Sequence, residues 1–274
     1  MAKWFDCSMV FSELDLYDLR FQLLGDIVDW FVVVESGMTH SGERHAAPFG
    51  EALRAGRYAD VEDKILYEYL PELAGDESWG REHNQRAQIA NVLRDMAEAD
   101  DWIAVTDADE LLSPSAIAEL KPLPAASGFV AAKFEQQFFY YDFHHRVQQG
   151  WGTGACRWRF RQEPNAIRAC DFGDVKPVTF LQGGWHYSYM TSAQGVTDKI
   201  RAFMHWDWAI NKPEVLDEAY IYNCMRTGVD IWGRGLPIEY IPHPDNLPLP
   251  VLQNPQKYIA LGWLEPTFEI GRLL

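Results

Sequence analysis

The sequence has no run of basic residues that would suit a nucleic acid. Its 24 Lys and Arg are outnumbered by 40 Asp and Glu, which leaves a formal net charge of −16 at pH 7. Proteins that bind DNA or RNA neutralise phosphates with clustered Lys and Arg side chains. We therefore expect no nucleic-acid partner. The excess of carboxylates suits either a solvated surface or a bound divalent cation.

Long apolar runs are also missing. Residues 26–34 (DIVDWFVVV) fall well short of the roughly 18 apolar residues that span a membrane, and they fit a buried strand. The first residues, MAKWFDCSMVF, lack the apolar core of a signal peptide. The four cysteines form neither a C-x-x-C pair nor a zinc-like spacing. We therefore expect a cytoplasmic protein with reduced cysteines and no transmembrane segment.

Length and apolar pattern favour one α/β domain over residues 1–274. Residues 28–34, which are apolar except for Asp29, and residues 102–106, which are apolar up to Thr106, are runs typical of parallel strands that are covered on both faces. Helical patterns are found in residues 13–24, with Ser12 as the predicted N-cap, and in residues 81–99. With further strands at 3–11 and 64–69, this order predicts an open, mostly parallel sheet flanked by helices.

The pattern changes after residue 125. Residues 128–143 and 155–161 predict longer strands, and helices are expected near 196–210 and over 214–227, the latter ending at Gly228. The segment from Pro237 onward is rich in proline and predicts a wrap dominated by loops.

Acidic residues follow three of the predicted strands, as Ser12-Glu13, Glu35-Ser36 and Asp107-Ala108-Asp109-Glu110. Ligands of open α/β sheets bind beyond the carboxyl ends of the strands. Carboxylates are hard ligands that suit Mg²⁺ or Mn²⁺, and such an ion neutralises a diphosphate leaving group. Asp-x-Asp alone is common in acidic loops, but its place after a buried strand favours a metal site at Asp107 and Asp109.

Two other groups of candidates have more than one interpretation. His186, in the segment GWHYSY, is either a packed core imidazole or a further ligand to a carboxylate-bound metal. Arg81 and Arg86 lie at the start of a predicted helix. Arginines at such a place either hold phosphate together with free backbone N–H groups or form surface salt bridges.

Five segments, taken in order, resemble those of the family-17 glycosyltransferases. They are FDCSMVFSELDLYDLRFQLL, VDWFVVVESGMTHSG, WGREHNQR, DDWIAVTDADEL and GGWHYSYM, with Lys199 downstream. The resemblance runs from about residue 4 to about residue 235. It implies a GT-A-type nucleotide-sugar-binding fold. In such a fold, residues 1–125 would form the nucleotide-sugar-binding half, 126–236 the acceptor and catalytic half, and 237–274 a C-terminal wrap.

The resemblance also implies an activity, namely transfer of GlcNAc from UDP-GlcNAc to a glycan with inversion to a β-linkage, using Mn²⁺ or Mg²⁺. Asp107 and Asp109 match the family's acidic motif, and His186 matches its Gly-Trp-His segment. Glu35 matches the end of the Val-Glu-Ser strand, and Arg81, Glu82 and Arg86 match the Arg-Glu-x-x-x-Arg pattern. We therefore expect Asp107, Asp109 and His186 at the metal, and Ser12, Glu13, Glu35, Arg81, Arg86 and Asp107 at the nucleotide sugar.

The catalytic base is expected in the acceptor half. Inversion in one displacement needs a carboxylate within about 3 Å of the acceptor hydroxyl, or one water away. Asp207 stands between Trp206 and Trp208, whose rings would hold a sugar and raise the carboxylate pKa by desolvation. We predict Asp207 as the base and Glu135 as the second choice. The other acids considered in this half are Asp142, Asp171 and Asp174.

The acceptor and two competing functions stay open at this point. Animal members of the family are membrane-anchored, whereas this sequence begins close to the catalytic domain. We therefore expect an oligosaccharide or polysaccharide acceptor, either a bacterial or viral surface polysaccharide or a lipid-linked oligosaccharide. The alternatives are a carbohydrate-binding protein without catalysis and a metal-dependent nucleotidyltransferase. The latter usually carries a G-x-x-x-x-G-K-[ST] loop, which this sequence lacks.

Overall fold

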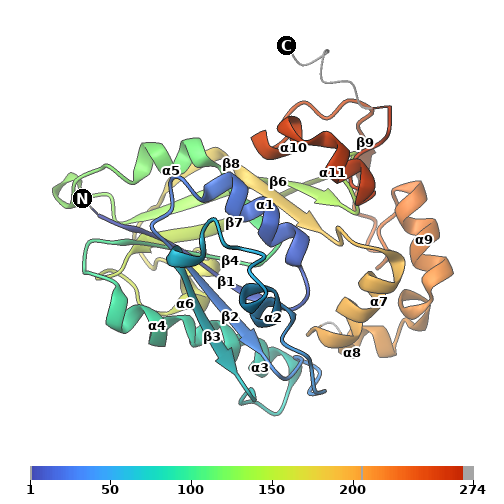
Figure 1. Ribbon diagram of the computed structural model, residues 1–274, viewed down its shortest axis with the longest axis horizontal. Coiled ribbons are helices and arrows are strands. Elements are labelled where there is room, and N and C mark those ends of the chain that lie inside the picture. Colours follow the sequence, from blue (N-terminus) through green and yellow to red (C-terminus); the bar gives the residue numbers. More distant parts are fainter. Residues whose placement is uncertain (1, 205, 268–274) are drawn as a thin grey trace. The chain divides into compact units, whose positions relative to one another are not determined.

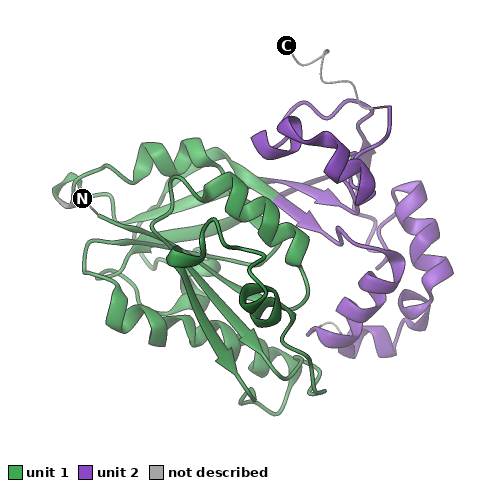
Figure 2. Cartoon of the chain, in the orientation of Figure 1, with its two compact units in different colours: residues 1–136, 151–185 green, residues 137–150, 186–274 purple. Residues whose placement is uncertain are grey.

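The computed structural model describes residues 2–204 and 206–267, and the chain forms two compact units (Figures 1 and 2). Unit 1 consists of residues 1–136 and 151–185, and unit 2 of residues 137–150 and 186–274. The chain therefore passes from one unit to the other at residues 136–137, 150–151 and 185–186.

Strands and helices alternate through the first part of unit 1, as predicted. The elements are β1 (Trp4–Val10), α1 (Leu14–Leu24), β2 (Trp30–Ser36), α2 (Pro48–Arg54), the 3₁₀ turn η1 (Glu62–Lys64), β3 (Ile65–Leu70), α3 (Ser78–Ala87), α4 (Ile89–Met96) and β4 (Trp102–Thr106). They are followed by β5 (Glu110–Leu112), α5 (Pro114–Leu120) and η2 (Ala125–Ser127), and later in the chain by α6 (Pro164–Arg168).

Three long strands have residues in both units, namely β6 (Ala131–Tyr140), β7 (His145–Arg157) and β8 (Val178–Ser188). The remaining elements belong to unit 2. They are α7 (Ala193–Ala202), α8 (Trp206–Ile210), η3 (Pro213–Leu216), α9 (Glu218–Thr227), β9 (Ile238–Tyr240), α10 (Leu249–Gln253) and α11 (Pro255–Ala260).

The sheet has the strand order β3-β2-β1-β4-β7-β6-β8-β5, and β9 pairs with β7. β1 is parallel to both β2 and β4, and β2 is parallel to β3. The direction changes at β7, which is antiparallel to β4. The predicted α/β fold with an open sheet flanked by helices is confirmed, and its strands β3, β2, β1 and β4 are parallel neighbours.

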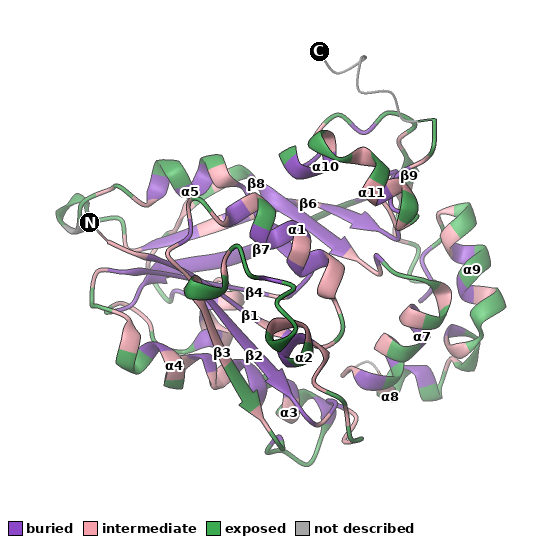
Figure 3. Cartoon of the chain, in the orientation of Figure 1, coloured by how far each residue is buried: buried purple, intermediate pink, exposed green. Residues whose placement is uncertain are grey.

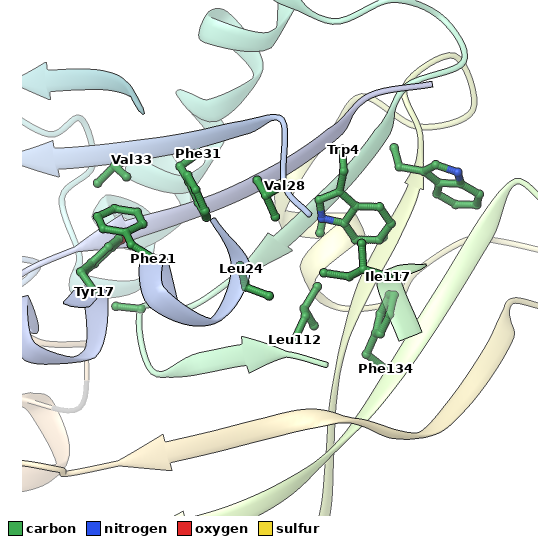
Figure 4. Packing of buried hydrophobic residues seen from close by; sticks show 14 of the residues in the cluster. Trp4, Tyr17, Phe21, Leu24, Val28, Phe31, Val33, Leu112, Ile117 and Phe134 are labelled. Carbon is green, nitrogen blue, oxygen red and sulfur yellow. The ribbon is translucent and has the colours of Figure 1, made fainter. Parts of the chain in front are cut away.

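Alternating residues of the parallel strands pack against helices on the two faces of the sheet, because successive side chains of a strand point to opposite sides. On one face, α1, α2 and α5 cover a cluster that includes Trp4, Phe31, Tyr17, Phe21, Phe49 and Ile117 (Figure 4). On the other face, α4 and α6 cover a cluster that includes Phe5, Val32, Ile103, Ile89, Leu93 and Ile167. Figure 3 shows the same arrangement as buried strands between helices with exposed outer sides.

Several local predictions were wrong. Glu13, not Ser12, precedes the first turn of α1, and its Oε2 accepts hydrogen bonds from the backbone N–H groups of Phe11 and Ser12, both at 3.0 Å. The helix expected over 81–99 is two helices. They separate at Gln88, whose N–H is shared between the carbonyl oxygens of Asn84 and Gln85.

The second half of the chain also differs in detail from the prediction. The strand expected over 155–161 is the end of β7, which starts ten residues earlier, at His145. In place of one helix near 196–210 there are α7 and α8, and residue 205 lies outside the described residues. α9 ends at Gly228, as predicted, because this glycine adopts φ +64°. The segment after Pro237, predicted to be dominated by loops, contains the short elements β9, α10 and α11.

Within residues 2–204 and 206–267, no helix has both the length and the apolar character needed to cross a membrane.

Candidate functional site

The acidic segment Asp107–Glu110 connects β4 to β5 in unit 1. Because β1, β2 and β4 are parallel neighbours, this segment lies at the edge where their carboxyl ends meet. Asp109 and Glu110 are buried, with 7% and 0% of their surface exposed, and Asp107 is partly exposed. Two of the three carboxyl groups of the segment thus have little access to water.

Two arginines hold the Asp107 carboxylate. Arg86 Nη2 lies 3.0 Å from Oδ1, and Arg168 Nη2 lies 2.9 Å from Oδ2. Burial alone would raise the pKa of Asp107, but the charges of Arg168 and Arg86 outweigh it and hold the pKa well below its ordinary value. Asp107 is therefore a permanent anion whose two oxygens both accept charge-assisted hydrogen bonds.

The Glu110 carboxylate has three hydrogen-bond donors. Its Oε1 accepts from Arg168 Nη2 and from Trp151 Nε1, and its Oε2 accepts from the backbone N–H of Asp107 at 2.8 Å. Burial raises the pKa of Glu110 to about 7, although the charge of Arg168 opposes this shift. Glu110 therefore changes its charge close to neutral pH.

Arg86 links this segment to α3 and α6. It pairs with Glu82 one turn earlier on α3, and its Nη1 donates to Asn165 Oδ1 at 3.1 Å. Burial raises the pKa of Glu82 above its ordinary value. Arg86 Nε and Glu82 Oε2 are both buried and have no hydrogen-bond partner within the described part of the chain. Unused hydrogen-bonding capacity therefore remains beside Asp107.

The side chain of Arg20, on α1, contacts the backbone of the same acidic segment. Its Nη1 pairs with Asp6 Oδ2 at 2.7 Å. Its Nη2 donates to the carbonyl oxygens of Asp107 and Glu110, at 2.8 and 2.7 Å, and to Thr106 Oγ1 at 3.1 Å. Arg20 was not predicted as a site residue. Its sequence signal is a charged side chain on the apolar, sheet-facing side of a helix.

Arg168 and Trp151 were also not predicted. Arg168 ends a helix of only five residues, which is too short to show a periodic pattern. Its guanidinium lies over the Trp151 ring, with 5.6 Å from Cζ to the ring centroid. Neither residue belongs to a recognisable sequence motif, so their contacts with the acidic segment are evident only from the structure.

Glu35, predicted at the nucleotide, supports the start of α2. Its two carboxylate oxygens accept from the backbone N–H groups of Phe49 and Gly50, at 2.8 and 2.9 Å. Tyr67 Oη donates to the same carboxylate at 2.6 Å. Glu35 is fully buried and already has three donors, so it acts as an anion at a helix N-terminus. Its contact with a nucleotide stays a prediction.

The other residues predicted at the nucleotide lie in loops or at loop contacts. Arg81 donates to the carbonyl oxygens of His40 and Asp76, at 2.9 and 3.2 Å, and so holds the loop that follows β2. Glu13 turns the chain after β1 through its two backbone contacts, and Ser12 is exposed beside it. Their roles toward a nucleotide stay predictions.

His186 lies in unit 2 and is 6% exposed. Its ring stacks on Phe138, with 4.4 Å between centroids and 8° between planes, and its Nε2 lies 3.0 Å from Ser188 Oγ. This is the packed environment that was one of its two interpretations. Its role as a metal ligand stays a prediction.

The two candidates for the catalytic base are not in desolvated surroundings. Asp207 is exposed in the first turn of α8, and the neighbouring Trp208 is 47% exposed. The burial between tryptophan rings that favoured Asp207 is therefore absent. Glu135 on β6 is partly exposed and pairs with Lys133 at 3.3 Å. The identity of the base stays a prediction.

The family model for glycosyltransferase family 17 matches residues 1–243. The chain belongs to glycosyltransferase family 17. The family predicted from the five segments is thus confirmed, and the match includes the Asp107–Glu110 segment and every residue predicted as a ligand or as the base.

Known relatives agree with this family assignment. This family-17 chain is 27% identical over 266 residues to the β-1,4-mannosyl-glycoprotein 4-β-N-acetylglucosaminyltransferases of Rattus norvegicus, Homo sapiens and Mus musculus. The alignments cover 84% of this chain and 48% of each relative, so the chain spans about half the length of these proteins. The crystal structure of S. aureus TarS 1-349 matches with a TM-score of 0.43 at 10% identity, covering 79% of this chain and 70% of that one.

The acidic segment of this family-17 chain suits a divalent cation only if substrate phosphates or water supply further ligands. Within the described ranges, no group of three His, Cys, Asp or Glu side chains is arranged to hold a metal ion. Both oxygens of Asp107 are engaged by arginines. Mg²⁺ and Mn²⁺, however, are commonly held by one or two carboxylates together with substrate phosphates and water. The role of Asp109 as a metal ligand stays a prediction.

Proposed function

We propose that this chain transfers GlcNAc from UDP-GlcNAc to an oligosaccharide or polysaccharide, with inversion to a β-linkage, on a GT-A-type fold. Family membership over residues 1–243 is the observation that carries the proposal. Relatives of the chain are named for N-acetylglucosaminyl transfer. The Asp107–Glu110 segment supports a donor site in unit 1, because it lies at the sheet edge where open α/β folds bind their ligands.

We infer that a divalent cation, Mn²⁺ or Mg²⁺, binds with the donor at Asp109. The charges around the segment support this. Five carboxylates (Asp6, Glu82, Asp107, Asp109 and Glu110) interact with three guanidinium groups (Arg20, Arg86 and Arg168), which leaves an excess of two negative charges when all are ionised. A single divalent cation balances that excess. When bound, the ion would neutralise the charge that develops on the diphosphate leaving group.

The two aspartates have different tasks in this proposal. Asp107 is held by Arg86 and Arg168 through one hydrogen bond on each oxygen, so a metal ion would compete with two guanidinium charges for this carboxylate. Asp107 therefore serves the ribose side of the nucleotide, or the ion through a water molecule, and Asp109 is the direct ligand. We further propose His186 as a metal ligand, and Asp207 or Glu135 as the base that deprotonates the acceptor.

Titration with UDP tests the donor site. In Asp109→Ala, the Mn²⁺-dependent affinity for UDP and the slow hydrolysis of UDP-GlcNAc should both be lost, while the melting temperature stays near that of the wild type. The matched control is Asp171→Ala, which removes an exposed carboxylate of unit 1 that pairs with Arg161. Unchanged Mn²⁺–UDP affinity in Asp109→Ala would contradict the assignment.

The same assays separate the competing functions. A carbohydrate-binding protein would bind glycans but release no UDP from UDP-GlcNAc in the wild type. A nucleotidyltransferase would exchange pyrophosphate instead of releasing UDP. Release of UDP that increases with added oligosaccharide supports glycosyl transfer and identifies the class of acceptor.

A further inference from the structure

Arg20 is a fully buried cation whose hydrogen bonds go mainly to main-chain atoms. Only Nη1 pairs with a carboxylate, that of Asp6. Nη2 is shared among the carbonyl oxygens of Asp107 and Glu110 and the Thr106 hydroxyl, and it lies 3.5 Å from the carbonyl oxygen of Ala108. One nitrogen therefore lies at the centre of the connection between β4 and β5.

The geometry of the Arg20–Asp6 pair indicates that Arg20 does more than stabilise the fold through an ion pair. Arginine and carboxylate groups usually form their strongest pairs through two parallel hydrogen bonds. Here the pair has one such bond. Asp6 Oδ1 and Arg20 Nε are buried without partners within the described part of the chain. The orientation of the guanidinium thus favours hydrogen bonds with the loop over a second hydrogen bond with Asp6.

The loop depends on this cation for its shape. The carbonyl oxygens of Asp107 and Glu110 converge on Nη2, and converging carbonyl dipoles repel one another unless a donor lies between them. The side chains of the same two residues are held by Arg168 on α6. Backbone and side chains of the segment are therefore fixed by different arginines from different helices.

We propose that Arg20 is a positioning residue of the donor site. It fixes the main chain of residues 106–110 in the shape that presents Asp107 and Asp109 to the nucleotide sugar and its cation. The inference rests on the proposed function for the identity of the ligand. The holding of the loop itself does not depend on that function.

Two substitutions separate loop positioning from stability. Arg20→Lys keeps a positive charge for Asp6, but a single ammonium group does not reproduce the planar fork that serves both the carboxylate and the loop. Asp6→Asn is the matched control, because it weakens the ion pair and leaves the contacts of Arg20 with the loop intact. Full-length protein is compared by melting temperature, by the KM for UDP-GlcNAc with Mn²⁺, and by hydrogen exchange of the amides of residues 106–110.

In Arg20→Lys, we expect the donor KM to rise by about tenfold or more, because at least one hydrogen bond from a charged donor is lost. The amides of residues 106–110 should exchange faster. In Asp6→Asn, the melting temperature should fall while the donor KM and the exchange of the loop stay near wild-type values. If Arg20→Lys does not fold, the double variant Asp6→Asn/Arg20→Gln, which removes both buried charges, replaces it.

Two results would overturn the inference. One is wild-type loop exchange and donor KM in Arg20→Lys. The other is an equal loss of stability and donor affinity in both single variants, which would make Arg20 only a structural residue. A wild-type protein that neither binds UDP nor turns over UDP-GlcNAc would refute the proposed function instead. The exchange data on residues 106–110 would then still decide whether Arg20 holds the loop.

Discussion

Unit 1 should lose stability as the pH rises through neutrality, and Glu110 should be responsible. Its carboxyl is fully buried, and burial raises its pKa from the ordinary 4.5 to about 7. The folded state therefore holds the proton more tightly than the unfolded state. A group with a raised folded pKa contributes stability that is complete below the unfolded pKa and is lost as the pH rises through the folded pKa.

The size of this effect follows from the two pKa values. A shift from 4.5 to about 7 corresponds to about 3 kcal/mol of unfolding free energy. Most of it should be lost between about pH 5 and about pH 8. Asp107 contributes little to the pH dependence of the unfolding free energy between about pH 5 and about pH 8. Its folded pKa is depressed, so the stability that it contributes is present above its unfolded pKa and is lost only in strong acid.

Glu110→Gln removes the titrating group and keeps a side chain of similar size. Urea denaturation of the wild type and the variant is measured from about pH 5 to about pH 8 with a chelator present, so that no divalent cation adds its charge. The difference in unfolding free energy between the two proteins should change by about 2.5 kcal/mol across this range, in favour of the variant at high pH. Glu119→Gln, which changes an exposed carboxyl on α5, serves as the control. A pH-independent difference for Glu110→Gln would refute the reasoning.

Two further substitutions test roles that were predicted from the sequence. Glu35→Gln should cost about 1–2 kcal/mol of stability, because the start of α2 loses an anionic partner, and should leave the donor KM unchanged. A raised donor KM at unchanged melting temperature would instead support the nucleotide contact that was predicted for Glu35. Asp207→Asn should lower kcat by about 10²-fold or more while Mn²⁺–UDP binding persists. Near wild-type turnover would exclude Asp207 and make Glu135 the next residue to replace.

The parallel part of the fold was predictable because it depends on local patterns. Residues 30–34 and 102–105 are apolar without interruption, and this is the signature of strands that are covered on both faces. Acidic residues after these strands then marked the sheet edge. The long strand β7, which is antiparallel to β4, was less predictable, since it contains Gly150, Gly152 and Gly154, which interrupt any alternating pattern.

The charged partners of the acidic segment were not predictable in the same way. Arg86 was recognised within a motif, but Arg168 comes from a helix 61 residues after Asp107 and contributes through tertiary contact alone. In the sequence, Arg20 is only a charged residue among the apolar residues of the helix α1. The loop position of Asp107 and Asp109 follows from local sequence, whereas the charges that control their pKa values follow from packing between distant helices. The predicted location in the cytoplasm stays a prediction.

The chain passes from one unit to the other three times, and this limits how the two units can be expressed separately. A stop codon after residue 136 would remove residues 154–157 of β7, which pair with β4, and all of α6, which carries Arg168. Unit 2 likewise loses residues 137–150 if expression starts at residue 186. Neither unit corresponds to one uninterrupted stretch of the gene. Splitting them would therefore require a linker that replaces residues 137–150 in unit 1, rather than a simple truncation.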